Sequence, residues 1–107
     1  MKRYGQVIRI KPEKLEEYKA YHKNVWPEVL DIIRKCNIRN YSIFHKDGYL
    51  FAYFEYVGDD FEADMEKMAA NPEIQKWWNI MKPMQEPLET RVEGEWWANM
   101  EEIFHVD

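Results

Sequence analysis

One histidine and its aromatic neighbours are the residues of this sequence best suited to proton-transfer chemistry. Tyr18 and His22 are four residues apart, so on a helix a phenol and an imidazole share one face. Trp26 follows His22 by four residues and adds an aromatic wall. Because histidine gives and takes protons near neutral pH, we take His22 as the candidate general acid and base. The alternative interpretation is a core histidine held by a single hydrogen bond.

Trp77 and Trp78 are the second candidate feature. Neighbouring residues of a helix point in different directions, so the two indoles cannot lie equally deep in one core. In one interpretation, one tryptophan is in the core and the other at an interface. In the other, the pair forms a wall that stacks on the apolar C–H face of a sugar ring. For Trp96 and Trp97 we expect an interface or lid contact.

Other kinds of site have little support in the sequence. No two of the three histidines have the spacing of metal ligands, and the single cysteine, Cys36, excludes an intrachain disulfide and a cysteine-built zinc site. The four glycines form no phosphate-binding loop. We therefore expect neither a metal nor a cofactor.

Charge and length narrow the function classes further. The net charge of −5 argues against nucleic acid as a partner. The sequence contains no apolar run that could span a membrane and no signal-peptide pattern, so we expect a cytoplasmic protein. A chain of 107 residues favours a single domain, residues 1–107, with one hydrophobic core. Aromatic residues make up 16% of the chain, more than such a core needs, and surplus aromatic surface usually lines a ligand pocket or a subunit interface.

The elements that position these residues follow from the hydrophobic spacing. We expect a first strand over Tyr4–Ile10 and then a helix that starts at Lys11-Pro12-Glu13, since proline suits a first turn. Pro27 should break the helix near Asn24–Trp26 and open a second one. Seven side chains at alternating steps of three and four share one stripe of this stretch: Leu15, Tyr18, His22, Val25, Val29, Ile32 and Cys36.

A β-hairpin should follow these helices. The strands Ile38–Lys46 and Tyr49–Val57 flank Asp47-Gly48, a strong signal for a two-residue turn. Alternation divides the first of these strands into two faces, Tyr41, Ile43 and His45 on one and Ser42, Phe44 and Lys46 on the other. The face that begins with Tyr41 is either exposed or lines a pocket, and the alternation alone does not decide between the two.

The last third of the chain predicts two helices and a strand. Asp59-Asp60 should cap a helix over Phe61–Ala70, and a second helix from Pro72 should carry the first tryptophan pair. Lys82–Glu95 has no apolar periodicity and predicts a lid, an interface arm or a disordered segment. Trp96–Val106 predicts the final strand.

The resulting order, βαββαβ, is that of the ferredoxin-like α+β fold. In this fold a four-stranded antiparallel sheet carries its helices on one face. The other face should present large apolar side chains, and a second copy of the same sheet is a good cover for it. We therefore expect a homodimer.

Taken together, these segments resemble the L-rhamnose mutarotase family over nearly the whole chain. The resemblance rests on the following segments: Tyr18-x-x-x-His22, Val25-Trp26-Pro27-Glu28, Asn40-Tyr41-Ser42-Ile43, Trp77-Trp78 and Met100-Glu101-Glu102-Ile103-Phe104. It implies a dimeric α+β barrel of ferredoxin-like protomers. It also implies an enzyme that interconverts the anomers of a free sugar, L-rhamnose, without metal or cofactor.

The resemblance further implies the residues of the site. His22 matches the family's proton donor, and the substrate-contacting positions match Tyr18, Tyr41, Trp77 and Trp78. Little is recognisable in Lys82–Trp97, so a related 6-deoxy sugar stays open as the substrate. Two other function classes on this type of fold also stay open. They are cofactor-free monooxygenases, with the related haem-degrading enzymes, and non-catalytic ligand-binding modules.

Overall fold

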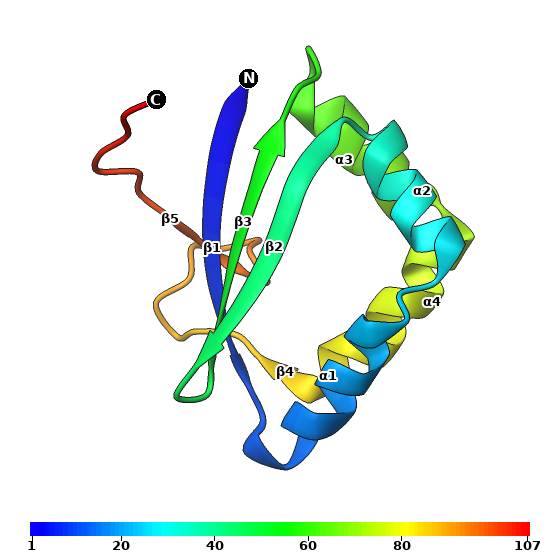
Figure 1. Cartoon of the computed structure of the whole chain (residues 1–107), viewed down its shortest axis with the longest axis vertical. Helices are drawn as coiled ribbons and strands as arrows, with labels where there is room; N and C mark the ends of the chain where they lie inside the picture. Colours follow the sequence, from blue (N-terminus) through cyan, green and yellow to red (C-terminus); the bar gives the residue numbers. More distant parts are fainter.

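The computed structural model describes residues 1–107 as a curved antiparallel sheet with all its helices on one face (Figure 1). The strands are β1 (Lys2–Ile10), β2 (Ile38–Lys46), β3 (Tyr49–Tyr56), β4 (Gln85–Glu86) and β5 (Ala98–Met100). The helices are α1 (Leu15–Lys23), α2 (Pro27–Lys35), α3 (Phe61–Ala70) and α4 (Pro72–Met81), with 3-10 turns η1 (Pro12–Lys14) and η2 (Lys82–Met84). No helix has the length and apolar character needed to cross a membrane. The expected α+β architecture is confirmed.

The fourth strand of the sheet is built in two pieces. The strand order is β2-β3-β1-β4, and β5 also pairs with β1. β4 pairs with Arg9 and Ile10, whereas β5 pairs with the stretch from Gly5 to Val7. The two short strands therefore share one edge of β1, which is the place of the last strand in the ferredoxin-like order. The stretch between them, residues 87–97, leaves the sheet and returns to it.

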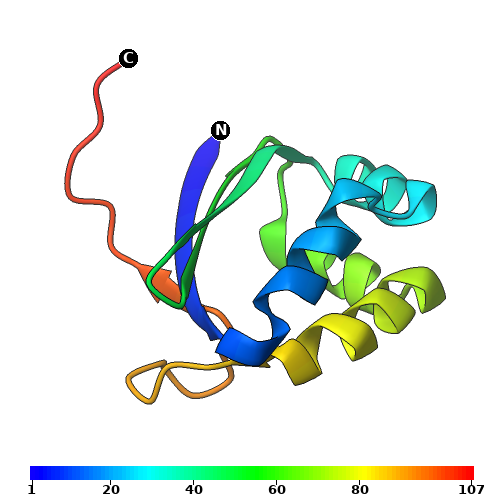
Figure 2. The ribbon, with the colours of Figure 1, turned by 60° about the horizontal axis from the view of Figure 1, so that its bottom comes forward.

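The predicted final strand, Trp96–Val106, is wrong in extent, because only Ala98–Met100 pairs. Residues 101–107 are exposed, and Arg3 Nε donates to Glu102 at 3.0 Å beside the edge of β1. The apolar side chains beyond it, Ile103, Phe104 and Val106, are exposed. Nothing within this chain buries them, so hydrophobic burial does not stabilise further pairing. The tail (red) extends away on the side of the sheet opposite the helices (Figure 2).

The first helical stretch breaks where proline predicts. α1 ends at Lys23, and α2 opens with Pro27 at its first position. Trp26 has a ψ of 135°, the extended backbone that is favoured before proline. Because of this break, the apolar side chains of both helices face the sheet. Tyr18 from α1 and Val29 from α2 are buried in the same core.

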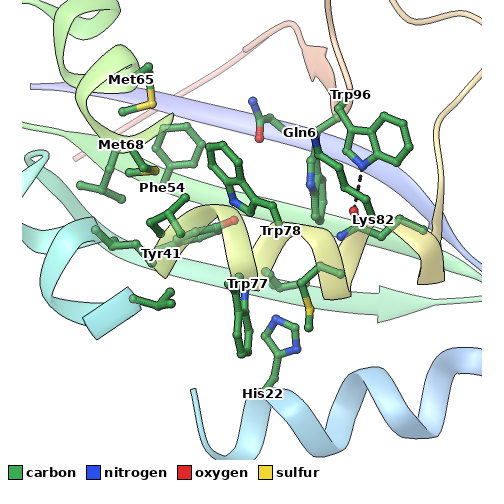
Figure 3. A pocket seen from close by; sticks show the side chains of 18 of the residues that line it. Gln6, His22, Tyr41, Phe54, Met65, Met68, Trp77, Trp78, Lys82 and Trp96 are labelled. Carbon is green, nitrogen blue, oxygen red and sulfur yellow. Dashed lines mark hydrogen bonds between the residues drawn. The ribbon is translucent and has the colours of Figure 1, made fainter. Parts of the chain in front are cut away.

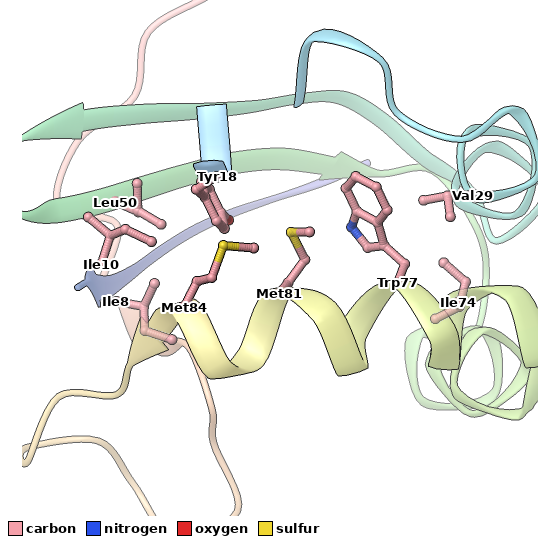
Figure 4. Close-up of a cluster of buried hydrophobic side chains, with 9 residues drawn as sticks. All are labelled: Ile8, Ile10, Tyr18, Val29, Leu50, Ile74, Trp77, Met81 and Met84. Atoms are coloured by element: carbon pink, nitrogen blue, oxygen red, sulfur yellow. The ribbon is translucent and has the colours of Figure 1, made fainter. Parts of the chain in front are cut away.

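The core lies between the sheet and α1, α2 and α4 (Figure 4). Nine side chains form it: Ile8, Ile10, Tyr18, Val29, Leu50, Ile74, Trp77, Met81 and Met84. Along β3, alternate residues from Leu50 to Tyr56 are buried toward the helices. Burying one large aliphatic side chain contributes about 1.5–3 kcal/mol, so this layer supplies the main cohesion between sheet and helices.

The hairpin is confirmed, and β2 contains a feature that the sequence analysis missed. Asp47 and Gly48 have φ values of 52° and 82°, as the two-residue turn requires. A bulge lies between Arg39 and Ser42, with Asn40 at a φ of 51°. An uninterrupted alternation would place residues 38 and 41 on opposite faces. Because the bulge inserts one extra residue, both face the helices, and Tyr41 is aimed into the space between the layers.

A polar cluster joins β3 to α3. The Tyr56 hydroxyl donates to Asp64 Oδ2 at 2.5 Å, and Asn37 Nδ2 donates to the same oxygen at 3.0 Å. The bond from Tyr56, followed by that from Asn37, holds the pKa of Asp64 below its usual range. The carboxylate is 8% exposed, so these bonds replace the water that it has lost.

Gly58 is expected to be intolerant of a side chain because it packs against this cluster. A Cβ there would meet the Tyr56 hydroxyl and lie 2.8 Å from Asn37 Nδ2. Gly58→Ala should lower the free energy of unfolding by about 1–3 kcal/mol, measured by thermal or urea denaturation. Gly5→Ala is the control, since its Cβ would meet only the Met100 methyl group, at 3.4 Å. Equal stability of the two variants would contradict the close approach at Gly58.

Candidate active site

A cavity of about 440 Å³ lies between the sheet and the helices, and it contains all five predicted site residues (Figure 3). This volume is within the range of small-molecule pockets. Of its 20 lining residues, 16 are hydrophobic. A second cavity, of about 410 Å³, shares seven lining residues with the first, and Tyr18, His22, Tyr41 and Trp77 are among them. A bound molecule here would meet mainly aromatic surface and a few polar groups.

His22 on α1 has one fixed nitrogen and one free nitrogen. Its Nδ1 lies 2.8 Å from the backbone carbonyl oxygen of Tyr18. A carbonyl oxygen only accepts, so Nδ1 carries the hydrogen and Nε2 keeps its lone pair. Nε2 has no partner within the chain, and the half-buried ring lines the cavity. The single hydrogen bond of the core-histidine interpretation is present, but the free nitrogen leaves the ring able to accept a proton from a bound molecule.

The aromatic wall beside the imidazole is Trp77 and not Trp26. The rings of His22 and Trp77 meet edge to face, with centroids 5.5 Å apart. Trp26 lies behind, 5.2 Å from Trp77, and does not line the cavity. On the other side of His22, the Tyr18 ring lies 4.3 Å away. The imidazole is therefore held between a phenol and an indole.

The tryptophan pair divides as helix geometry predicts, but both indoles reach the cavity. Trp77 is 6% exposed and belongs to the core, whereas Trp78 is half-buried. Lys82 Nζ lies 5.7 Å from the centre of the Trp78 ring and 5.5 Å from that of Trp96. This cation links the two indoles at the mouth of the cavity.

Two phenols face the cavity as neutral groups. Tyr41 is 43% exposed as a residue, and desolvation of its phenol raises its pKa to about 12. Burial likewise raises the pKa of Tyr18 above its usual range, and a hydrogen bond from Gln85 opposes part of that shift. Neither phenol ionises near neutral pH, so both serve as hydrogen-bonding groups and not as bases.

The segment Lys82–Glu95 contributes to the site in a way that the sequence analysis did not foresee. It was expected as a lid, an arm or a disordered stretch, but η2 and β4 begin it, and Met84 and Gln85 are buried in it. Gln85 Nε2 donates to the Tyr18 hydroxyl at 3.0 Å, and Trp96 Nε1 donates to Gln85 Oε1 at 2.8 Å. No pattern of spacing in the sequence marks this glutamine.

Gln6 on β1 is a further polar residue of the wall that the sequence analysis missed. Its Nε2 donates to Asn99 Oδ1 at 3.0 Å, and Asn99 Nδ2 donates to Glu95 Oε2 at 2.7 Å. The bond from Asn99 is the main cause of the lowered pKa of Glu95. Because Gln6 donates through its amide nitrogen, its carbonyl oxygen is left free. No group of three or more histidine, cysteine, aspartate or glutamate side chains comes together to hold a metal.

Comparisons with known proteins agree on one family. A family model described as "rhaM: L-rhamnose mutarotase" matches residues 3–106. The L-rhamnose mutarotase of Oceanobacillus iheyensis is 34% identical, and the match covers 100% of both chains. The crystal structure of an L-rhamnose mutarotase from Formosa agariphila covers 100% of both chains, with a TM-score of 0.78 at 23% identity. Tetracenomycin F2 cyclase from Streptomyces glaucescens has a TM-score of 0.75 at 15% identity, over 100% of this chain and 98% of its own. Likeness at these low identities shows the fold alone.

The different depths of the two tryptophans predict different costs of truncation. Trp77→Ala removes a core indole and should lower the free energy of unfolding by about 3–5 kcal/mol. Trp78→Ala removes a half-buried indole and should cost less than half of that. Urea denaturation of both variants, followed by far-UV circular dichroism, measures the difference. Equal losses would contradict the assigned depths.

Proposed function

The chain belongs to the L-rhamnose mutarotase family, and we propose that His22 carries the family's reaction, the interconversion of the α and β anomers of L-rhamnose. The protein is accordingly an isomerase of rhamnose metabolism. One observation supports the role of His22 above the others. Its Nδ1–H is held by the Tyr18 carbonyl, and its Nε2 is free beside an aromatic cavity.

The reaction needs one proton to be taken and one to be given. His22 Nε2 accepts the proton of the anomeric hydroxyl, the bond between C1 and the ring oxygen breaks, and a carbonyl forms at C1. The imidazolium then gives its proton to the ring oxygen. After rotation about the C1–C2 bond, the same steps in reverse close the ring to the other anomer. The protons balance, and proton transfer by a positioned side chain accelerates such steps by about 10²–10⁴-fold.

The remaining residues bind and orient the sugar. Trp77 and Trp78 offer indole faces to the apolar C–H face of the ring. Tyr18 and Tyr41, which stay protonated, hydrogen-bond to its oxygen atoms. Holding the anomeric hydroxyl near Nε2 makes the transfer effectively intramolecular. No observation favours an oxygenase or a non-catalytic binding module.

His22→Ala should fold nearly normally yet lose most of the acceleration of anomer exchange, by about 10²–10⁴-fold. Saturation transfer between the two anomer signals of L-rhamnose measures the rate, and thermal melting checks the fold. His105→Ala is the control, because His105 is in the exposed tail, outside both cavities, and its imidazole hydrogen-bonds to Asp107 alone. Exchange at the wild-type rate in His22→Ala would rule out its catalytic role. If the wild-type protein binds the sugar without exchanging it, or binds a quinol or haem instead, the proposed function is wrong.

We also propose that the protein is a homodimer in which the open sheet faces pack together. That face carries exposed aromatic side chains: Phe44, Tyr49 and Phe51 are 64%, 38% and 36% exposed. The tail extends on the same side of the sheet (Figure 2), and its apolar side chains Ile103, Phe104 and Val106 are exposed. Apolar surface of this kind typically marks a contact between proteins.

Light scattering should give twice the chain mass of 13.2 kDa at micromolar concentration. Phe51→Lys, which places a charge in the middle of the open face, should shift the mass toward one chain. Val92→Lys is the control, because Val92 is equally apolar, 67% exposed and outside the sheet. A wild-type mass near one chain would contradict the dimer.

A further inference from the structure

We infer that Gln85 and Trp96 are positioning residues that set the direction in which the Tyr18 hydroxyl forms its hydrogen bonds. The inference rests on the proposed function, since it concerns the same cavity. Both residues come from Lys82–Trp97, a stretch in which the sequence analysis named no substrate-contacting residue. They are joined to Tyr18 by two consecutive hydrogen bonds, at 2.8 and 3.0 Å.

The first bond determines the orientation of the amide. An indole N–H only donates, so the atom of Gln85 that faces Trp96 Nε1 must be the carbonyl oxygen. The nitrogen of the same amide then faces Tyr18. Lys82 Nζ, 5.5 Å from the centre of the Trp96 ring, stabilises the indole in this place (Figure 3).

The second bond determines the direction of the phenol. The amide nitrogen of Gln85 only donates, so the Tyr18 oxygen accepts, and its own hydrogen must point elsewhere. Gln85 and Tyr18 are 6% and 4% exposed, so bulk water has little access to this bond. The hydroxyl hydrogen is available to an oxygen of a molecule in the cavity.

These two bonds place a hydrogen-bond donor, the Tyr18 hydroxyl, beside an acceptor, His22 Nε2. The Tyr18 ring lies 4.3 Å from the His22 ring, whose free Nε2 accepts. Ring opening needs an acceptor for the proton of the anomeric hydroxyl and a donor toward the ring oxygen, where negative charge develops. If the amide of Gln85 were reversed, Tyr18 would donate to it instead, and the Tyr18 hydroxyl would face the sugar only as an acceptor. The two bonds therefore select the productive arrangement.

Three variants distinguish an effect on the direction of these hydrogen bonds from an effect on packing alone. Gln85→Glu keeps the shape but presents only acceptors, so Tyr18 should donate to it, and kcat for anomer exchange should fall by about 100-fold. Gln85→Met removes the bond without reversing it, and kcat should fall by about tenfold or less. Trp96→Phe frees the Gln85 amide to reverse, and the loss of kcat should lie between the losses of the other two variants. KM should change little in all three, because the sugar is still held by the aromatic walls.

The matched control is Gln75→Glu, the same change on the exposed face of α4, where the amide bonds only the Ala69 carbonyl; it should keep the wild-type kcat. A merely structural role predicts instead that all three variants lose stability while the folded fraction keeps its kcat. Equal kcat for Gln85→Glu and Gln85→Met would overturn the inference. If a change at the buried position 85 prevents folding, Trp96→Phe still tests the inference.

A second readout needs no sugar. The indole N–H signal of Trp96, assigned by its loss in Trp96→Phe, should exchange slowly with solvent in the wild-type protein. It should exchange faster in Gln85→Met and stay protected in Gln85→Glu, whose carboxylate still accepts. Rapid exchange in the wild type would overturn the inference. If the wild type fails to exchange anomers while this signal is protected, the proposed function is wrong and the hydrogen-bonded chain stands.

Discussion

The edge-on packing of Trp77 is the contact on which the rest of this molecule depends. From α4, its indole meets Tyr21 and His22 of α1 and Trp26 of the linker, with ring centroids 6.0, 5.5 and 5.2 Å apart. Aromatic rings in this arrangement attract one another beyond their buried area. One side chain therefore sets the spacing between the first helix, its break and the last helix. The indole that joins these elements is also part of the cavity wall.

Within that aromatic enclosure, hydrogen bonds within the chain determine the orientation of the polar groups. The Tyr18 carbonyl, a backbone group, determines the tautomer of His22, and Glu95 determines the orientation of the Asn99 amide and, through it, that of Gln6. An apolar surrounding makes each such bond stronger and each unpaired group more costly. The folded chain thus fixes the orientation of these hydrogen-bond donors and acceptors before any molecule binds. This preorganisation favours catalysis over simple binding.

Local rules in the sequence predicted the elements well because each had its own signal. Pro27 marked the helix break and Asp47-Gly48 the hairpin, and the step of four residues brought Tyr18 and His22 together. The remainder depended on contacts between distant residues. The bulge at Asn40 arises because that residue adopts a positive φ, and Gln85 became part of the site only through pairing with β1 and a bond to Trp96. The length of the final strand was overestimated because β-propensity does not reveal whether the rest of the chain buries the side chains of a strand.

The two-piece fourth strand has a consequence for how proteins of this shape diversify. Both ends of the stretch 87–97 are tied to β1, by β4 at one end and β5 at the other. Closing a longer loop between two fixed points costs little, about 0.6 kcal/mol for each doubling of its length. Insertions and deletions between residues 88 and 94 should therefore leave strand register and core unchanged, whereas Trp96 and Trp97 pack against the core. A preference for a new substrate can therefore evolve through changes in this segment without loss of the fold.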